Sequence, residues 1–290
     1  MSITEGRITA NDLEFAYLEA GSGPLAICLH GFPDSAHTYR HLLPALAEAG
    51  FHAVAPFMRG YAPTAVPDDG RYQTAVLALD ACALHDALGG HDDAVIVGHD
   101  WGAMATYIAA NHEPERWKRV VTMAVPPAGA VATGFLTYTQ LKKSWYMFFF
   151  QHGLADIVVG MDDLAFIDGL WADWSPGYDG RDDIPAVKDA LGDPANLAAA
   201  LGYYRATLGG IGVDAALDAV QNKGNDTTPQ PTLYLHGRAD GCMGLEVAQA
   251  AAAFLTSPGS RMQVVDGAGH FLHVEKPDEV NQLIIDHLTA

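Results

Sequence analysis

Short apolar runs alternate along most of the chain with longer segments in which apolar residues recur at helical spacing. The apolar runs are continuous, which is typical of strands that are covered on both faces of a sheet. They fall at residues 25–29, 52–55, 94–97 and 120–125. The intervening segments 35–49 and 75–88 each end at a glycine, as helices often do. Strands that alternate with helices predict an α/β fold with a mostly parallel sheet and right-handed crossover connections.

The chain begins with a hairpin pattern, and the alternation of strands and helices resumes near its end. Residues 7–20 alternate between apolar and polar side chains around a turn signal at Asn11-Asp12, which predicts two antiparallel strands. Further strands are expected at 232–235 and 262–265, and further helices at 245–255 and 279–288.

The long region between residues 127 and 229 breaks this pattern. It is rich in aromatic side chains and has the character of helices and loops. Turn-forming residues flank it, with Pro126-Pro127 before it and a proline-containing segment at 225–231 after it. We therefore expect residues 127–229 to form an inserted helical lid, or cap domain, over a core domain made of residues 1–126 and 230–290.

The amino-acid composition limits which binding partners and which cellular compartment we expect for the protein. The chain has 16 basic and 35 acidic residues, a formal charge of −19, which argues against nucleic acid and an anionic membrane surface as partners. No apolar run approaches the ~18 residues needed to span a bilayer, and no signal-peptide pattern opens the sequence. The three cysteines are widely spaced and form no C-x-x-C pair. We expect a cytoplasmic protein without a metal or redox centre; whether it is a monomer or a homo-oligomer stays open.

One short segment carries the strongest chemical signal. Residues 98–102 read Gly-His-Asp-Trp-Gly and lie between the apolar run 94–97 and a helix-like run. A strand, a sharp turn with flanking glycines and a helix make up the nucleophile elbow, usually G-x-S-x-G, whose central residue holds a strained backbone. Here the central residue is Asp100. A carboxylate is ionised at neutral pH without help from a base, and it suits displacement at a saturated carbon rather than acyl transfer.

Two further residues complete a constellation in the order nucleophile, acid, base. Asp240 and His270 each follow an expected strand, so they fall at the carboxyl edge of the sheet, where open parallel sheets place their sites. Asp240 could instead cap a helix. However, no acid follows the strand that ends at Val125, which favours Asp240 as the partner of His270. His99 is interpreted as a residue flanking the elbow and His273 as a packing residue.

Together these segments resemble an α/β-hydrolase-fold epoxide hydrolase, and the resemblance covers nearly the whole chain. Its further motifs are His30-Gly31-Phe32-Pro33, Arg59-Gly60-Tyr61 and Gly269-His270-Phe271. The resemblance implies that the backbone amides of Phe32 and Trp101 form the oxyanion hole. It also implies two ring-opening tyrosines in the lid. These are Tyr146, which stands in a Tyr-x-x-x-Phe-Gln context, and Tyr204, which precedes an arginine; Tyr203 is the rival of Tyr204.

The reaction of that family explains why these residue types are needed. Asp100 would attack an oxirane carbon and form an alkyl ester, while protonated tyrosines donate to the leaving oxygen. His270, held by Asp240, would then activate a water molecule that attacks the ester carbonyl beside the oxyanion hole, giving a vicinal diol. The expected partners are a small apolar epoxide and water, and no metal or organic cofactor is required.

Two other functions fit part of the pattern. A haloalkane dehalogenase resembles this chain in its Asp, its His and the Trp after the nucleophile, but it needs a second halide donor where this chain has Phe32. A non-catalytic ligand-binding protein on the same fold would have no need to keep the whole constellation. The lid aromatics suggest an apolar pocket. Its tentative lining residues are Phe32, Trp101, Phe149, Phe150 and Trp171.

Overall fold

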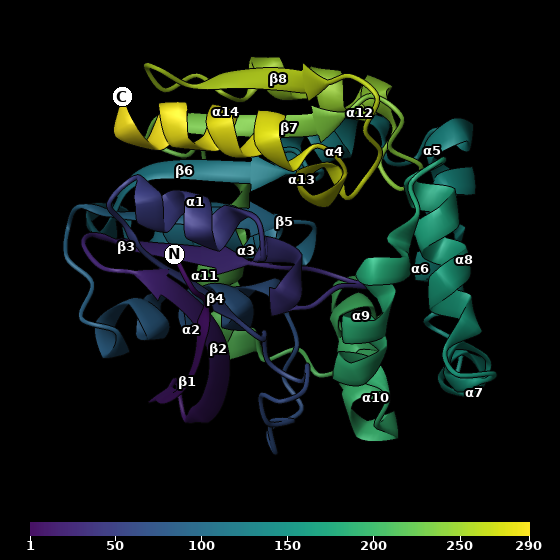
Figure 1. Cartoon of the computed structure of the whole chain (residues 1–290). Helices are drawn as coiled ribbons and strands as arrows, with labels where there is room; N and C mark the ends of the chain where they lie inside the picture. Colours follow the sequence, from purple (N-terminus) through teal and green to yellow (C-terminus); the bar gives the residue numbers. More distant parts are fainter.

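One eight-stranded sheet runs through the molecule, and the computed structural model describes all residues from 1 to 290 (Figure 1). The strands are β1 (Thr4–Ala10), β2 (Leu13–Gly21), β3 (Leu25–Leu29), β4 (His52–Pro56), β5 (Ala94–His99), β6 (Trp117–Met123), β7 (Thr232–Gly237) and β8 (Arg261–Val265). Their order across the sheet is β1-β2-β4-β3-β5-β6-β7-β8. Strand β2 pairs antiparallel with β1 and β4, and all other neighbours are parallel. The predicted hairpin and the mostly parallel sheet are therefore confirmed.

Helices cover both faces of this sheet, which explains why its central strands are apolar throughout. In β3, Leu25, Ile27 and Leu29 belong to one apolar cluster and Ala26 and Cys28 to another, so successive side chains enter opposite layers. Helices α2 (Thr74–Ala87) and α3 (Trp101–His112) lie on one face, and α1 (Leu42–Glu48) and α14 (Pro277–Thr289) lie on the other (Figure 1). The remaining helices of the core are α12 (Leu245–Gln249) and α13 (Leu272–Glu275).

Three predicted elements differ from the structure, and two of them differ for evident local reasons. The third is the helix expected at 245–255, which is α-helical only in α12 and continues as a 3-10 turn over Ala250–Ala253. The helix expected over 35–49 is interrupted: a 3-10 turn over Ala36–Tyr39 precedes α1, which begins at Leu42. Pro44 lies in the first turn of α1, and a proline is accepted there but not farther inside a helix, so one continuous helix is excluded. The strand expected at 120–125 is β6, which ends at Met123 because Ala124 turns to a positive φ of 66°.

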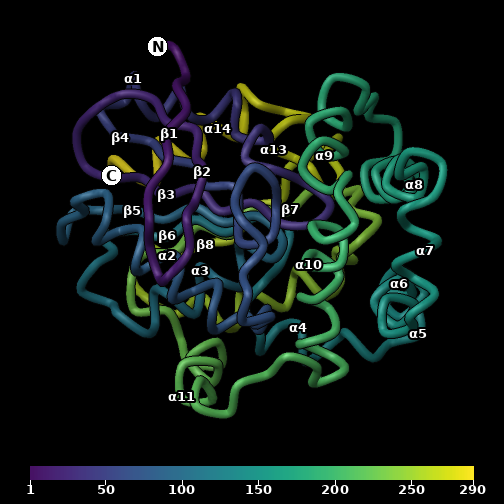
Figure 2. Tube along the Cα trace, turned by 90° about the horizontal axis from the view of Figure 1, so that it is seen from below, coloured from purple at the N-terminus to yellow at the C-terminus, as the bar shows by residue number.

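The chain between β6 and β7 forms eight helices. They are α4 (Ala128–Gly134), α5 (Tyr138–Lys143), α6 (Trp145–Phe149), α7 (Leu154–Gly160), α8 (Ala165–Trp174), α9 (Ile184–Leu191), α10 (Pro194–Tyr204) and α11 (Asp218–Gln221). In Figures 1 and 2, helices α5 to α10 gather beyond the carboxyl ends of the parallel strands. By contrast, α4 packs against α12, and α11 packs against α2 and α3. The division of the chain at residues 127 and 229 stays a prediction.

None of these helices combines the length and the hydrophobicity that a bilayer crossing requires.

Candidate active site

Asp100 lies at the tip of the turn between β5 and α3. Its backbone has a φ of 53° and a ψ of −118°, a strained conformation for a residue with a side chain. The strand and the helix approach closely at this turn. A Cβ added to Gly98 would lie 2.3 Å from the carbonyl oxygen of Gly102 and 2.4 Å from Oγ1 of Thr106. The structure thus has the geometry expected of a nucleophile elbow, with a carboxylate in the central position.

The carboxylate of Asp100 is buried, and its two oxygens face different groups. Oδ1 accepts a 2.8 Å hydrogen bond from the backbone N–H of Phe32. Oδ2 lies 3.7 Å from Nε2 of His270. Burial raises the pKa of Asp100 above its ordinary value, and the charge of His270 and the amides of Phe32 and Trp101 offset part of the rise. One oxygen is therefore held by an amide, while the other lies near an imidazole.

His270 and Asp240 are in direct contact, as expected from their positions after β8 and β7. Nδ1 of His270 lies 3.0 Å from Oδ2 of Asp240. The other oxygen of Asp240 accepts 2.7 and 2.8 Å hydrogen bonds from the backbone amides of Cys242 and Met243. Burial alone would lower the pKa of His270, but the carboxylates of Asp240 and Asp100 outweigh it and hold this pKa above the ordinary value. Buried Nε2 of His270 has no hydrogen-bond partner, so it is available to a bound molecule.

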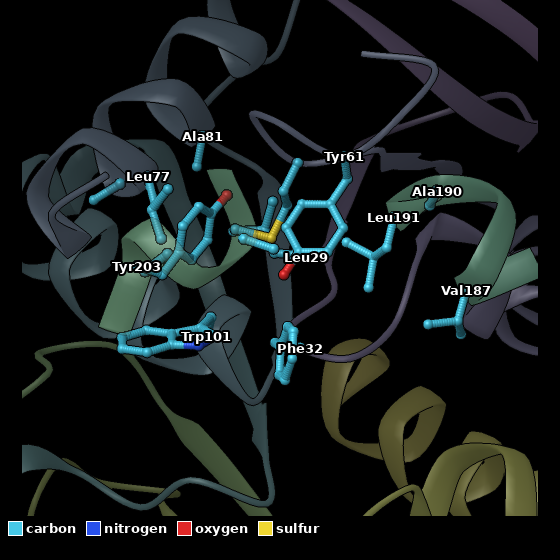
Figure 3. Close-up of a cluster of buried hydrophobic side chains, with 14 of the residues drawn as sticks. Leu29, Phe32, Tyr61, Leu77, Ala81, Trp101, Val187, Ala190, Leu191 and Tyr203 are labelled. Atoms are coloured by element: carbon cyan, nitrogen blue, oxygen red, sulfur yellow. The ribbon is translucent and has the colours of Figure 1, made fainter. Parts of the chain in front are cut away.

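The three tyrosines considered for ring opening differ in what their hydroxyls contact. Tyr146 and Tyr204 line the cavity above Asp100, with ring centroids 5.6 Å apart. The hydroxyl of Tyr204 is buried and has no hydrogen-bond partner. In contrast, the hydroxyl of Tyr203 donates to the backbone oxygen of Arg59 at 2.8 Å. Figure 3 shows Tyr203 extending away from Trp101. The structure therefore directs Tyr204, and not Tyr203, toward the cavity.

A cavity of about 640 Å³ opens onto Asp100, and most of the residues that line it are hydrophobic. Trp101, Met104 and Ile108 line it from α3, and Val131 and Phe135 line it from α4 and the residue that follows α4. This volume is in the range of small-molecule sites.

Four of the five tentative lining residues do not line this cavity, and only Trp101 does. Phe32 and Phe150 are fully buried and pack edge-to-face on each other, with centroids 5.6 Å apart. Phe149 packs on Phe166 at 6.0 Å. Trp171 stacks on Phe271 at 3.6 Å, and its Nε1 donates to the backbone oxygen of Pro33. These rings support the walls from behind, so the prediction for them is corrected.

The sequence reasoning missed two residues that contact the site. Sγ of Cys242 lies 3.3 Å from the hydroxyl of Tyr146 and belongs to the cavity wall. The backbone oxygen of Trp174 accepts a 3.0 Å hydrogen bond from the N–H of His270, and its ring packs edge-on at 5.0 Å. Cys242 could have been predicted to lie near the site, because it follows Asp240 by only two residues. Trp174 belongs to the lid aromatics that suggest an apolar pocket, but nothing in the local sequence placed it beside His270.

Two buried groups offer three possible metal-ligand atoms within 4.8 Å of one another. One is the site itself, with Asp100, Cys242 and His270, and the other is Asp34, His99 and His273. In the second group, Nε2 of His99 lies 2.9 Å from the backbone oxygen of His270. Burial raises the pKa of Asp34 to about 8 and lowers that of His273 to about 3. A metal ion at this group would have to displace the proton of Asp34, whereas neutral His273 is already in the form that binds metals.

The fold and this site define the class of the protein. The sequence matches the α/β hydrolase fold family over residues 24–277, and the chain belongs to that family. A relative named Epoxide hydrolase A, from Mycobacterium tuberculosis, is 32% identical over 325 residues, which cover 99% of this chain and 98% of the relative. An epoxide hydrolase of Caballeronia sordidicola is 30% identical over 319 residues, covering 99% and 94%.

Solved structures agree with this grouping. The crystal structure of Epoxide Hydrolase A from Mycobacterium thermoresistibile matches 100% of this chain and 99% of its own, with a TM-score of 0.84 and 26% identity. The predicted fold class and the resemblance to epoxide hydrolases of this fold are thereby confirmed.

Proposed function

We propose that this chain is an epoxide hydrolase that opens an oxirane to a vicinal diol through an alkyl ester on Asp100. Relatives that align over nearly their whole length carry that name. The observation that carries the mechanism is the position of Asp100: its Oδ1 is held by the Phe32 amide and its Oδ2 lies beside His270.

The first half-reaction is a displacement at carbon. Oδ2 of Asp100 forms a bond to an oxirane carbon, and the bond from that carbon to the ring oxygen breaks. The ring oxygen leaves with the electron pair and takes a proton from a tyrosine hydroxyl. Tyr204 suits this role because its hydroxyl is unpartnered and burial holds its pKa well above 10.0, so it stays protonated. Tyr146, whose ring packs edge-to-face on that of Tyr204 and lines the same cavity, is the second donor.

The second half-reaction regenerates the carboxylate. Nε2 of His270 accepts a proton from water, and the water oxygen attacks Cγ of the Asp100 ester. The charge then develops on Oδ1, where the Phe32 amide already donates a hydrogen bond in the resting enzyme. The tetrahedral centre collapses by breaking the bond from Cγ to the diol oxygen, which takes the proton held by His270. The proton left on the carboxyl group returns to the tyrosinate formed in ring opening. Asp240 stabilises the imidazolium and fixes the ring orientation through Nδ1.

A haloalkane dehalogenase is the second candidate, because the buried Nε1 of Trp101 has no acceptor and a halide could fill that place. The side chain of Phe32 offers no second donor. A halide needs no proton on leaving, so the free hydroxyl of Tyr204 favours the epoxide as substrate.

One experiment tests the covalent step. Excess enzyme is given one turnover of styrene oxide in heavy-oxygen water, and the peptide containing Asp100 is examined by mass spectrometry. We expect the label in Asp100 and ordinary oxygen in the diol, because the water oxygen stays on the carboxylate. Label in the diol alone would contradict the ester, and halide release from bromoalkanes that outpaces diol formation would favour the second candidate. The Asp100→Ala variant is the control and should show neither label nor turnover.

A further inference from the structure

The cavity runs along α3, and Asp100 is the one charged residue of its lining; both features bear on which epoxides it accepts. We propose, building on the proposed function, that the enzyme selects uncharged epoxides whose long apolar substituent lies along α3. We further propose that it discriminates against epoxides that carry a carboxylate on that substituent.

The direction of the cavity follows from helix geometry. Trp101, Met104 and Ile108 all line it, and their spacing of three and four residues places them on one face of α3. Seven residues of helix separate the first from the last, about 10 Å at ~1.5 Å per residue. The far end continues to Gly224, where an added Cβ would lie 3.2 Å from Ile108. Asp100 sits at the near end, so a substituent on the attacked epoxide extends along this wall.

The mouth of the cavity is marked by lining residues that reach solvent. Leu136, after α4, is 77% exposed, and Leu208, after α10, is 40% exposed. Asn222 and Asn225, after α11, are also exposed and line the cavity. The distal end therefore offers apolar contacts and neutral amides, which suit an alkyl chain or a neutral polar end.

No lysine, arginine or histidine lines this cavity, and its one carboxylate is Asp100. The nearest basic residue in sequence at the mouth is Lys223, whose Nζ lies 3.1 Å from a carboxylate oxygen of Asp226. Near the site, Nζ of Lys143 donates to the backbone oxygen of Asp240 at 2.7 Å. Both ammonium groups already have acceptors, and the whole chain carries a formal charge of −19.

An anionic substituent would meet two penalties in such a cavity. Its carboxylate would lose water without gaining a cationic partner, and it would share a low-dielectric space with the ionised Asp100. A methyl ester of the same chain has nearly the same shape and avoids both penalties. Selection between the two is therefore a direct measure of the charge of the cavity.

The test compares a fatty acid that carries a terminal epoxide with its methyl ester. The chain is chosen so that the carboxylate lies about 10 Å from the epoxide, inside the mouth. We expect kcat/KM for diol formation at neutral pH to favour the ester by a factor on the order of ten or more. A longer homologue of the acid, whose carboxylate passes the mouth into water, should lose most of this disadvantage.

Matched variants locate the effect. Asn222→Lys places a cation at the mouth and should raise the ratio of acid to ester turnover several-fold. Asn222→Gln changes the same position without charge, and Leu154→Lys adds the same charge on α7, outside the cavity; both should leave the ratio unchanged. Because the readout is a ratio, a variant that is less active overall remains informative.

The results separate this inference from the function on which it depends. Equal use of the acid and the ester by the unaltered enzyme would overturn the selection against charge. Hydrolysis of styrene oxide without hydrolysis of either long substrate would overturn the placement of the substituent along α3. Failure with all epoxides, styrene oxide included, would overturn the proposed function itself, and this inference with it.

Discussion

Replacing Asp240 with asparagine removes one charge and almost no volume, so it tests what the acid contributes to His270. Each oxygen of Asp240 faces a donor. Oδ1 accepts from the amides of Cys242 and Met243, and Oδ2 lies 3.0 Å from Nδ1 of His270. An asparagine has one acceptor and one donor end, so it can match only one of these sides.

The more favourable orientation keeps the amide oxygen on the two backbone N–H groups. The NH₂ group then faces Nδ1 of His270, which must become an acceptor, and the ring proton moves to Nε2. In that tautomer His270 cannot take a proton from water. The loss of the proper tautomer in a comparable buried triad costs about 10⁴ in rate. The opposite orientation sets NH₂ against two N–H donors and leaves buried groups unpaired, at a cost of about 1–3 kcal/mol each.

The two half-reactions should respond differently to this change. Alkylation needs Asp100 as a carboxylate, and the Nε2–H tautomer of His270 can still donate toward Oδ2, 3.7 Å away in the resting enzyme. Ester hydrolysis needs the base. We therefore expect Asp240→Asn to form the ester at a rate near that of the unaltered enzyme and to hydrolyse it about 10³–10⁴ times more slowly.

Stopped-flow fluorescence with excess enzyme measures both phases, because Trp101 adjoins the reacting carboxylate. Intact-protein mass spectrometry should show the ester accumulating in the variant. Asp266→Asn, which removes an exposed charge outside the cavity lining, serves as the matched control. Hydrolysis at the unaltered rate in Asp240→Asn, or a complete absence of ester, would refute the role assigned to Asp240.

Three further predictions follow from the site. The rate of ester hydrolysis should fall as the pH drops through the pKa of His270, because its protonated form cannot act as a base; in the ester this pKa lies below that of the resting enzyme, since the charge of Asp100 that helps to raise it is gone, and a pH-independent rate would contradict this. Tyr204→Phe should slow ring opening by about 10²–10⁴. Tyr203→Phe should mainly lower the melting temperature, since its hydroxyl bonds a buried carbonyl, and single-turnover kinetics with calorimetry distinguishes the two. Gly31→Ala would place a Cβ 2.3 Å from Oδ1 of Asp100, so the chain should still fold by circular dichroism but lose about 10²-fold or more in kcat/KM; undiminished activity would place Asp100 elsewhere.

The sequence was most informative where a constraint is local. The elbow could be read because a turn between β5 and α3 needs a small residue such as Gly98, whatever the rest of the chain does. Asp240 and His270 could be placed because parallel strands bring their carboxyl ends to one edge. The aromatic residues of the lid could not be sorted in this way. Tyr203 and Tyr204 are neighbours in α10, and which of them faces the cavity depends on how that helix is rotated against the core.

The residues that line the cavity were predicted wrongly for a similar reason. Phe32 lies in a motif of the predicted site, and Trp171 lies in the predicted lid. Their rings, however, pack behind the walls of the cavity. The lining residues of α3 could have been predicted, because their spacing of three and four residues already places Trp101, Met104 and Ile108 on one face of a helix. The part of the lining that comes from α4 depends on tertiary packing against α12, which no local pattern encodes.

In the proposed mechanism, the charges of Asp100 and His270 link the two half-reactions, because each charge affects the pKa of the other residue. The carboxylate of Asp100 is one of the groups that raise the pKa of His270, and His270 in turn offsets the effect of burial on Asp100. Protonated His270 therefore favours the ionised nucleophile before the epoxide is attacked. Once Asp100 is esterified, its charge is gone, and the pKa of His270 falls toward the value at which it is a neutral base. Each half-reaction thus sets the protonation state that the next one requires.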